Sequence, residues 1–232
     1  MITRRPAAER GHADHGWLDT RHTFSFGDYH DPAFMGFHAL RVINEDRVQP
    51  AMGFGTHGHR DMEILTWVLE GALQHHDSLG NGSIIYPGDL QRMSAGTGVN
   101  HSEYNASRDD LVHFLQMWIV PEQAGFAPEY EQRRFTIRER QGMLKLLASP
   151  DGRGGSIRIH QDLHLYTTML TPGEKVSTSL GSGRSGWLQV SRGVVEVNGV
   201  RLDEGDGAAI IGETRLDLAA SDHTEVLLFD LA

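Results

Sequence analysis

The sequence predicts an all-β protein, and three features of its pattern support that prediction. Glycine occurs 27 times in 232 residues and interrupts short apolar runs along the whole chain, as is typical of strands joined by turns. The run at residues 111–120 alternates apolar and polar side chains as a half-buried strand does. The pair Asn198-Gly199 lies between two β-branched runs, which is a strong signal for a β-hairpin.

The first half of the chain contains a series of candidate strands at short spacing, which is typical of a closed or sandwich-like β-barrel. The best runs are residues 36–43, 64–69, 72–77, 82–86 and 111–120. Residues 78–82, Ser-Leu-Gly-Asn-Gly, have the composition of a hairpin turn between two of these runs. Pro121 ends the last strand, because proline cannot donate to a strand ladder.

The second half of the chain also contains a series of short candidate strands. Its candidate strands are residues 156–160, 163–170, 187–192, 194–198, 208–211 and 226–229. Between the halves, residues 129–141 are dense in Glu, Gln and Arg, and we interpret them as a solvated connecting segment with one or two helical turns. We therefore expect an N-terminal barrel over residues 1–135, a connector over 136–146 and a C-terminal barrel over 147–232.

Composition excludes several classes of protein. The net charge of −10 disfavours nonspecific binding to nucleic acid or to an anionic membrane, because no basic stripe is available. The absence of cysteine excludes disulfides and cysteine-based zinc sites. No window approaches the length of a membrane span and the first residues lack a secretory apolar region, so we expect a cytoplasmic protein.

Two short segments carry metal-capable side chains at positions i and i+2. The first contains His57 and His59, and the second contains His101 and Glu103. Side chains on a strand alternate faces, so each pair shares one face. If the two strands lie opposite each other in a barrel, three imidazoles and one carboxylate converge on a point inside it. This nitrogen and oxygen set suits iron, manganese, nickel, copper or zinc.

These segments resemble the two motifs of the cupin family, with one departure. The spacing Gly98-x2-His101-x3-Asn105 fits the second motif, but the usual carboxylate position of the first motif holds Ile64. Glu63 is one residue too early and would point the other way. A carboxylate displaced to Glu103 is the pattern of pirins, a branch of the cupins.

The resemblance to pirins extends beyond the ligands. It includes residues 10–19 (Arg-Gly-His-Ala-Asp-His-Gly-Trp-Leu-Asp), 22–26, 35–37, 40–44 and 94–98. The resemblance implies a bicupin, two antiparallel jelly-roll barrels packed together in one chain. The second barrel is expected to lack metal ligands, since residues 175–180 (Lys-Val-Ser-Thr-Ser-Leu) replace the His-x-His of the first motif.

The whole chain resembles the short bacterial pirins that act on quercetin, which implies a reaction. A flavonol such as quercetin is opened by O₂, and carbon monoxide and a depside are released. The metal ligands would be His57, His59, His101 and Glu103, with Glu103 also the catalytic base. The implied cofactor is one divalent transition metal, with Fe²⁺ first and Mn²⁺, Ni²⁺, Co²⁺, Cu²⁺ or Zn²⁺ as alternatives.

Other functions stay open at this point. A regulatory pirin that binds a protein partner without turnover is the main alternative, and an isomerase or hydrolase with the same metal is another. We expect a monomer that binds a small aromatic substrate and O₂. Candidate wall residues for an apolar cavity are Phe37, Leu40, Trp67, Met93, Phe114 and Met117.

Most of the fourteen histidines are expected to be structural or surface groups. The N-terminal ones, which are His12, His15, His22, His30 and His38, are interpreted as loop or packing residues. His113 is expected to be a satisfied interior residue, and Glu63 a surface residue, with a role as partner of a metal ligand as the alternative. Of the adjacent pair His75 and His76, one could line the barrel near the metal, but neither is assigned as a ligand.

Overall fold

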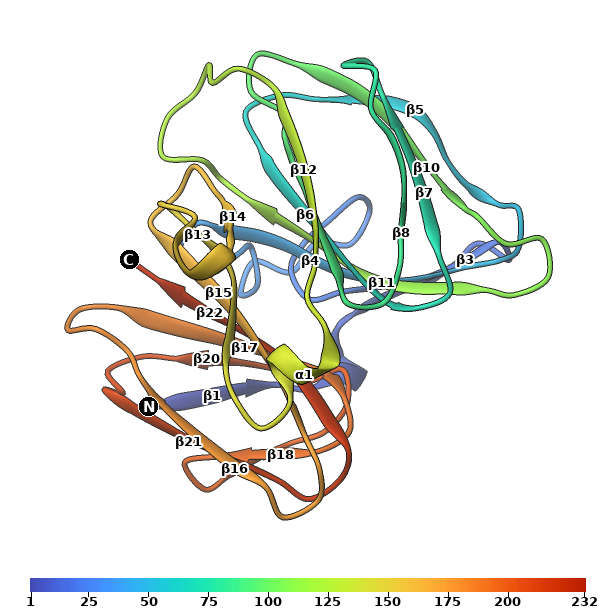
Figure 1. Cartoon of the computed structure of the whole chain (residues 1–232). Coiled ribbons are helices and arrows are strands. Elements are labelled where there is room, and N and C mark those ends of the chain that lie inside the picture. Colours follow the sequence, from blue (N-terminus) through green and yellow to red (C-terminus); the bar gives the residue numbers. More distant parts are fainter. The chain divides into compact units, whose positions relative to one another are not determined.

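The regular structure of the chain is almost all β-strand, as a computed structural model describing residues 1–232 shows (Figure 1). The helices are short: α1 (Ile137–Arg140) and two 3-10 turns, η1 (Ala7–Glu9) and η2 (Arg153–Gly155). No helix has the length and apolar character needed to cross a membrane. The strands form two compact units, one of residues 11–134 with 159–161, the other of residues 1–10, 135–158 and 162–232. The prediction of an all-β chain is confirmed.

The first unit, residues 11–134 with 159–161, contains a seven-stranded and a four-stranded sheet. The larger sheet runs in the order β12 (Glu129–Arg134), β9 (Asp89–Ser94), β6 (Glu63–Glu70), β11 (Val112–Ile119), β4 (Leu40–Val48), β3 (Leu18–His22), β2 (Gly11–Asp14). The smaller runs β5 (Gly53–His59), β10 (Val99–Asn105), β7 (Leu73–Asp77), β8 (Gly82–Ile85). All of these pairs are antiparallel.

The second unit repeats this plan of seven and four strands. Its larger sheet runs β1 (Ile2–Arg5), β20 (Gly207–Ile210), β17 (Ser185–Arg192), β22 (Thr224–Leu231), β15 (Leu163–Leu170), β13 (Lys145–Ser149), β14 (Ile157–Arg158). The smaller runs β16 (Lys175–Ser179), β21 (Arg215–Ala220), β18 (Val195–Val197), β19 (Val200–Leu202). Only the short β13–β14 pair is parallel. Each unit is therefore a two-sheet jelly roll whose hydrogen bonding does not close into a ring.

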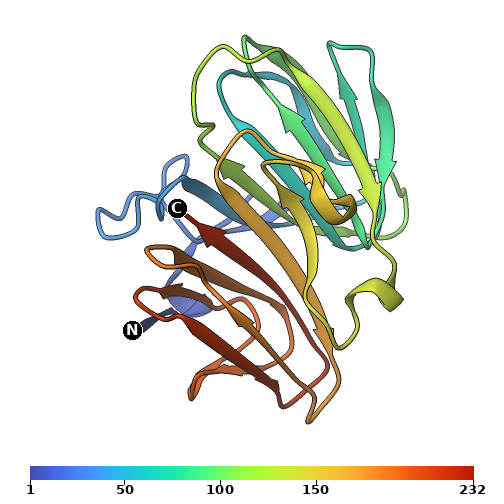
Figure 2. The same ribbon diagram turned by 60° about the vertical axis from the view of Figure 1, so that its left-hand side comes forward.

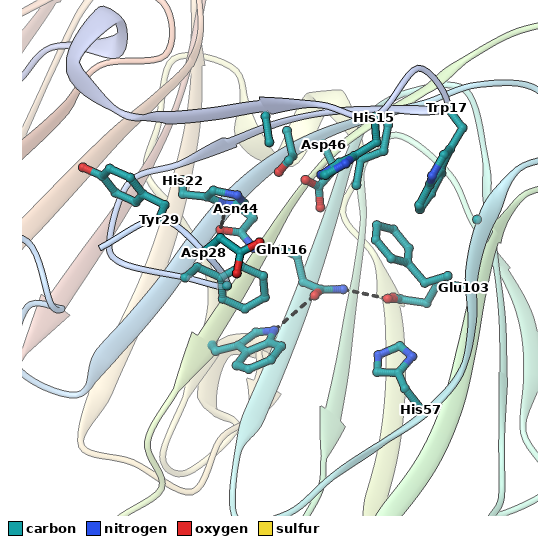
Figure 3. A pocket seen from close by; sticks show the side chains of 18 of the residues that line it. His15, Trp17, His22, Asp28, Tyr29, Asn44, Asp46, His57, Glu103 and Gln116 are labelled. Carbon is teal, nitrogen blue, oxygen red and sulfur yellow. Dashed lines mark hydrogen bonds between the residues drawn. The ribbon is translucent and has the colours of Figure 1, made fainter. Parts of the chain in front are cut away.

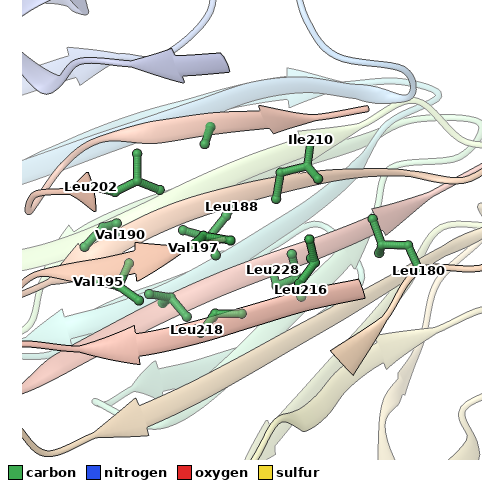
Figure 4. Close-up of a cluster of buried hydrophobic side chains, with 12 residues drawn as sticks. Leu180, Leu188, Val190, Val195, Val197, Leu202, Ile210, Leu216, Leu218 and Leu228 are labelled. Atoms are coloured by element: carbon green, nitrogen blue, oxygen red, sulfur yellow. The ribbon is translucent and has the colours of Figure 1, made fainter. Parts of the chain in front are cut away.

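Apolar side chains from both sheets fill the second unit. This core holds Leu180, Leu188, Val190, Val195, Val197, Leu202, Ala208, Ile210, Leu216, Leu218, Val226 and Leu228, all buried (Figure 4). Strand β16 carries the segment that replaces the His-x-His motif, and it pairs in register with β21. The interior of this unit is an aliphatic core of the kind that β-branched and leucine-rich strands form by burying one face.

In the first unit the comparable aliphatic core occupies only part of the space between the sheets. It consists of Leu18, Val48, Val68, Leu73, Ile85, Val112 and Phe114. A smaller buried cluster contains Ile64, Met93, Ala95 and Val99. The remaining interior carries polar side chains, among them the histidines singled out from the sequence. The first unit therefore combines a packed core with a functional interior.

The expected boundaries need correction at the N-terminus. The first ten residues belong to the second unit rather than to an N-terminal barrel over residues 1–135. Strand β1 adds to the edge of β20, with Ile2 opposite Ile210, and Arg10 donates from Nη1 to the carbonyl of Gly205 at 2.9 Å. Figure 2 shows this blue N-terminal segment beside strands from the red end of the chain. Within the segment interpreted as connecting, α1 supplies one helical turn, as expected, whereas β12 before it forms a regular edge strand with β9.

Local turn signals match the structure closely. Strands β18 and β19 pair with Val197 opposite Val200, so Asn198 and Gly199 form the predicted two-residue hairpin. Their φ angles of 47° and 84° are both positive, as a type I′ turn requires. Strands β7 and β8 likewise form the hairpin expected around residues 78–82.

Candidate metal centre

The two histidine segments form neighbouring strands of one sheet. Strands β5 and β10 pair antiparallel, with His57 opposite His101 and His59 opposite Val99. They are hydrogen-bonded neighbours that lie opposite each other in register, which is the condition under which the sequence predicted convergence. The register shifts between His101 and Glu103, so that Glu103 lies opposite Phe54 and β5 holds one extra residue. A bulge of this kind re-aims side chains locally, and here it places the histidines of both strands at one end of the interior.

The three imidazoles converge. Ring centroids are 4.8 Å apart for His57 and His59, 4.5 Å for His57 and His101, and 4.9 Å for His59 and His101. The Nε2 atoms of His57 and His101 are 3.1 Å apart. Two nitrogens bound at right angles to one ion, each at about 2.1 Å, would be separated by about 3 Å. The spacing therefore fits two ligands of a single metal ion.

The protonation states also favour metal binding. His57 donates from Nδ1 to the carbonyl oxygen of Gly55 at 2.8 Å, which leaves the Nε2 lone pair available. Nε2 of His59 is buried and has no hydrogen-bond partner. Burial, assisted by neighbouring imidazoles, lowers the pKa of His59 to about 4 and that of His101 to about 3. These two rings are neutral at neutral pH, so protons do not compete for their lone pairs.

Glu103 is the buried carboxylate of the site, with 2% of its surface exposed. Its Oε2 accepts a hydrogen bond from Nε2 of Gln116 at 2.7 Å, while Oε1 is buried without a partner. Gln116 in turn accepts from Nε1 of Trp118 at 3.1 Å (Figure 3). Burial raises the pKa of Glu103 to about 7, against the opposing effect of the Gln116 hydrogen bond. The carboxylate thus has one oxygen fixed and one oxygen free to bind a cation or accept a proton.

The potential ligand atoms fall into two groups that share His101. One group is His57, His59 and His101, and the other is His75, His101 and Glu103, each with its ligand atoms within 4.8 Å of one another. Three imidazole nitrogens and a carboxylate oxygen suit a divalent transition metal. The unpartnered Nε2 of His59 and Oε1 of Glu103 are buried polar atoms that such an ion would satisfy. The donor set therefore fits the cofactor that the sequence suggested.

His75 packs against the metal-centre residue His101 and is itself held by hydrogen bonds. It is fully buried, donates from Nε2 to Asp77 Oδ2 at 3.1 Å and accepts at Nδ1 from Nε2 of Gln91 at 3.2 Å. Its ring lies against Tyr130, with centroids 5.0 Å apart, and against His101 at 5.3 Å. Because both of its nitrogens have partners, His75 is better suited to hold His101 in place than to donate a lone pair to a metal.

A cavity of about 800 Å³ opens beside these residues. It is lined by His12, Ala13, His15, Trp17, Leu18, Thr20, His22, Phe26, Gly27, Asp28, Tyr29, Asn44, Asp46, Gly53, Phe54, Gly55, His57, His59, Glu103, Gln116 and Trp118 (Figure 3). Aromatic rings meet edge to face along its wall: Trp17 with Phe54, and Phe26 with Trp118, both at 5.3 Å. The cavity is large enough for a drug-sized aromatic molecule.

The expected wall residues are wrong. Phe37, Leu40, Trp67, Met93, Phe114 and Met117 do not line this cavity. Trp67 and Met117 alternate with residues that do face the interior, so they lie on the other face of the seven-stranded sheet. Phe114 faces inward but belongs to the aliphatic core.

Several functional candidates were missed in the N-terminal segment. His12, His15 and His22 line the cavity, although the sequence argument treated them as loop or packing residues. The signal that could have found them is the pirin-like pattern of residues 10–19 and 22–26, which extends the resemblance well beyond the metal motifs.

Two other assignments can be compared directly with the structure. His113 is a satisfied interior histidine, as predicted, with Nε2 2.9 Å from Oε1 of Glu45. Glu63 was expected at the surface but is 1% exposed, because its carboxylate meets the backbone nitrogen and ring of His160 at 3.4 and 3.3 Å. It does point away from the side of β6 that carries Ile64, as strand alternation requires.

Comparison with known proteins agrees with both halves of this architecture. The family model for pirin matches residues 3–119, and the model described as a quercetinase C-terminal cupin domain matches residues 146–231. A quercetin 2,3-dioxygenase of Escherichia coli strain K12 is 51% identical over 231 residues, covering 100% of this chain and 99% of the relative. A pirin-like protein of Caulobacter vibrioides is 42% identical over 233 residues, covering 100% of both chains.

Among solved structures, the crystal structure of YhhW from Escherichia coli has a TM-score of 0.96 at 51% identity, covering 100% of this chain and 98% of that one. The structure described as bacterial pirin YhhW in complex with nickel(II) gives a TM-score of 0.95 at 52% identity, covering 100% and 99%. With both cupin domains matched along the full chain, this protein belongs to the pirin family.

Proposed function

We propose that this protein is a metal-dependent quercetin 2,3-dioxygenase, which opens the heterocycle of a flavonol with O₂ and releases carbon monoxide and a depside. The observation that carries the proposal is an aromatic-walled cavity lined by His57, His59 and Glu103, beside which His101 completes a set of three convergent imidazoles. The name of the Escherichia coli relative, 51% identical over the full chain, supports the same reaction.

The metal ligands in this proposal are His57, His59, His101 and Glu103, and the ion is iron(II). The donor set suits several divalent ions, and the nickel(II) complex of a pirin supports a divalent metal without identifying the native one. When bound, the ion supplies a Lewis-acid centre that increases the acidity of an enolic hydroxyl and gives access to O₂ chemistry.

Glu103 is the residue that we propose as the general base. In the metal-free protein burial raises its pKa to about 7, so this carboxylate takes up a proton readily; with the ion held by one carboxylate oxygen, the other would accept the flavonol 3-hydroxyl proton. Gln116 holds Oε2, so the carboxylate cannot rotate freely and Oε1 keeps its orientation. The proton is thereby moved within the protein, away from bulk water.

The cavity walls hold the flat substrate and limit the entry of water. Trp17 and Phe54 form one aromatic corner, and Phe26 and Trp118 form another. Trp118 also contacts the ring of His59 edge to face at 4.8 Å. Such a surface buries the rings of a flavonol, and each ring gains free energy from the apolar area removed from water.

The test is aerobic depletion of quercetin by protein that has been stripped of metal and reloaded with iron(II), manganese(II) or nickel(II), with metal content measured. Metal-dependent loss of quercetin with release of carbon monoxide is expected. His57→Ala should lose both metal and turnover. The matched control is His76→Ala, a change on the same sheet at an exposed side chain that lies outside the cavity and pairs with Gln74.

Two results would count against the proposal. Wild-type turnover in a Glu103→Ala variant that still holds metal would remove the role of Glu103 as base, for which a loss of about 100-fold or more is expected. No quercetin depletion by fully metal-loaded wild-type protein would overturn the dioxygenase assignment and favour a regulatory, partner-binding pirin.

A further inference from the structure

Three polar side chains form a row across the floor of the cavity. His22 on β3 lies opposite Asn44 on β4, and Asn44 lies opposite Gln116 on β11. All three line the cavity, as Figure 3 shows. We call His22, Asn44 and Gln116 the transverse row. Directly opposed residues of neighbouring antiparallel strands share a face of the sheet, so the row is a consequence of strand register.

The two ends of the transverse row differ in their surroundings. At one end Gln116 contacts Glu103 and Trp118, so this end belongs to the reacting centre. Adjacent strands lie about 4.8 Å apart, so the row extends roughly 10 Å from Gln116 to His22. A flat ligand lying over the row with its reacting oxygen near Glu103 would therefore have its remote ring over Asn44 and His22.

Asn44 is the middle member of the row, between His22 and Gln116, and it lines the cavity. Its side chain is 4% exposed, and its Oδ1 lies 2.8 Å from Nδ1 of His22. With the proton on Nδ1, His22 donates to the amide oxygen, and the NH₂ group of Asn44 remains as a donor for other partners. Because Asn44 lines the cavity, a ligand there can supply such a partner.

The chemistry at this end of the cavity suits a hydroxyl group. The NH₂ group of Asn44 can donate to a hydroxyl oxygen. Asp46, two residues along β4 and on the same face, also lines the cavity. Carboxylate oxygens accept more than one hydrogen bond, so Asp46 can receive a hydroxyl proton in addition to its other contacts. Neighbouring ring hydroxyls would match this donor and acceptor.

We propose that Asn44 is a specificity-determining residue that binds a hydroxyl on the ring of the substrate remote from the reacting centre, so that the cavity selects flavonols hydroxylated on the pendant ring. This inference rests on the proposed function, because it takes a flavonol as the ligand. It adds a substrate preference that the metal centre itself does not determine.

The test compares quercetin with galangin, two flavonols that differ only in the two hydroxyls of the pendant ring. Binding is measured without O₂ on metal-loaded protein, by quenching of tryptophan fluorescence, and turnover is then measured in air. Wild-type protein is expected to bind quercetin about ten-fold more tightly than galangin, the contribution of roughly one hydrogen bond. Asn44→Leu should bring the ratio close to one by weakening quercetin alone.

The matched control is Gln74→Ala, which removes an amide from the same unit outside the cavity and should leave the ratio at its wild-type value. Equal affinity of wild-type protein for both flavonols, with turnover of both, would overturn the role of Asn44 and leave the dioxygenase assignment intact. This comparison needs no variant, so misfolding of Asn44→Leu would not hide the answer. Failure to bind or turn over either flavonol would overturn the proposed function itself.

Discussion

Replacement of Glu103 by glutamine should change the number of protons released when a metal binds. Burial raises the pKa of this carboxyl from 4.5 to about 7, so at pH 6 roughly nine in ten molecules carry the proton. A metal requires the ionised form, and binding therefore expels about 0.9 proton from Glu103 at pH 6. His59 and His101, with pKa values of about 4 and 3, are already neutral there and release almost none.

The sign of the pH dependence follows from this proton. Because the metal-free protein binds more protons than the metal-bound form below pH 7, metal affinity should rise about ten-fold from pH 6 to pH values well above 7 and then level off. Glutamine has nearly the same shape as glutamate and cannot ionise. Glu103→Gln should therefore release about 0.9 proton fewer than wild type at pH 6, and the difference should shrink to about 0.1 at pH 8.

Isothermal titration calorimetry with nickel(II), in two buffers of different ionisation enthalpy, counts these protons directly. The comparison between wild type and Glu103→Gln removes contributions that the two proteins share. Equal proton release by the two proteins at pH 6 would show that Glu103 is either ionised before the metal binds or outside the coordination sphere. Glu103 would then not be a metal ligand with a raised pKa.

Three further substitutions test the fold and the tuning of the site. Gly96→Ala should lower the free energy of unfolding by roughly 2–3 kcal/mol in a denaturant titration, because φ is +46° and a Cβ would collide with the carbonyl of Phe126. Gly199→Ala, where φ is +84° but no atom lies within 4 Å, should cost only about 1 kcal/mol in the same assay, and an equal cost at both sites would refute the role of the collision. Gln116→Leu removes the hydrogen bond that lowers the pKa of Glu103 in the metal-free protein, so the rise of nickel(II) affinity with pH should move to higher pH; an unmoved rise would show that Gln116 does not tune Glu103.

The sequence predicted those parts of the fold that depend on local pattern. The hairpin at Asn198-Gly199 follows from a two-residue turn that requires positive φ at both positions, and β15 begins and ends at the predicted residues 163 and 170. Strand β1 could not be predicted in this way. It is four residues long and largely exposed, and its partner β20 lies about 200 residues away in the chain. Only the complete sheet shows where such an edge strand pairs.

The candidate ligands could be predicted from the sequence because side chains alternate along a strand, so the spacing of two residues determines whether their side chains point to the same face. Histidines at i and i+2 must share a face, and their convergence needs only that two strands become neighbours. The residues of the cavity wall could not be predicted from the sequence. Hydrophobicity indicates that a residue is buried, but it does not distinguish a filled core from the wall of a cavity. Trp67 and Phe114 were expected in the wall as apolar residues, and both are fully buried. The walls instead use half-buried rings such as Trp17 and Trp118.

The position of Glu103, displaced from the usual cupin position, links the metal centre to the cavity wall. Position 64, where the usual cupin motif has its glutamate, holds an isoleucine that lies opposite Trp118 and packs with Met93 in an apolar cluster. With the carboxylate moved to Glu103 on the smaller sheet, its hydrogen-bond partner is Gln116 on the larger sheet, and Gln116 is oriented by Trp118. Both Gln116 and Trp118 also line the cavity. The residues that tune Glu103 are therefore part of the cavity wall, so a substitution at Trp118 that alters the shape of the cavity should also shift the pH dependence of metal binding.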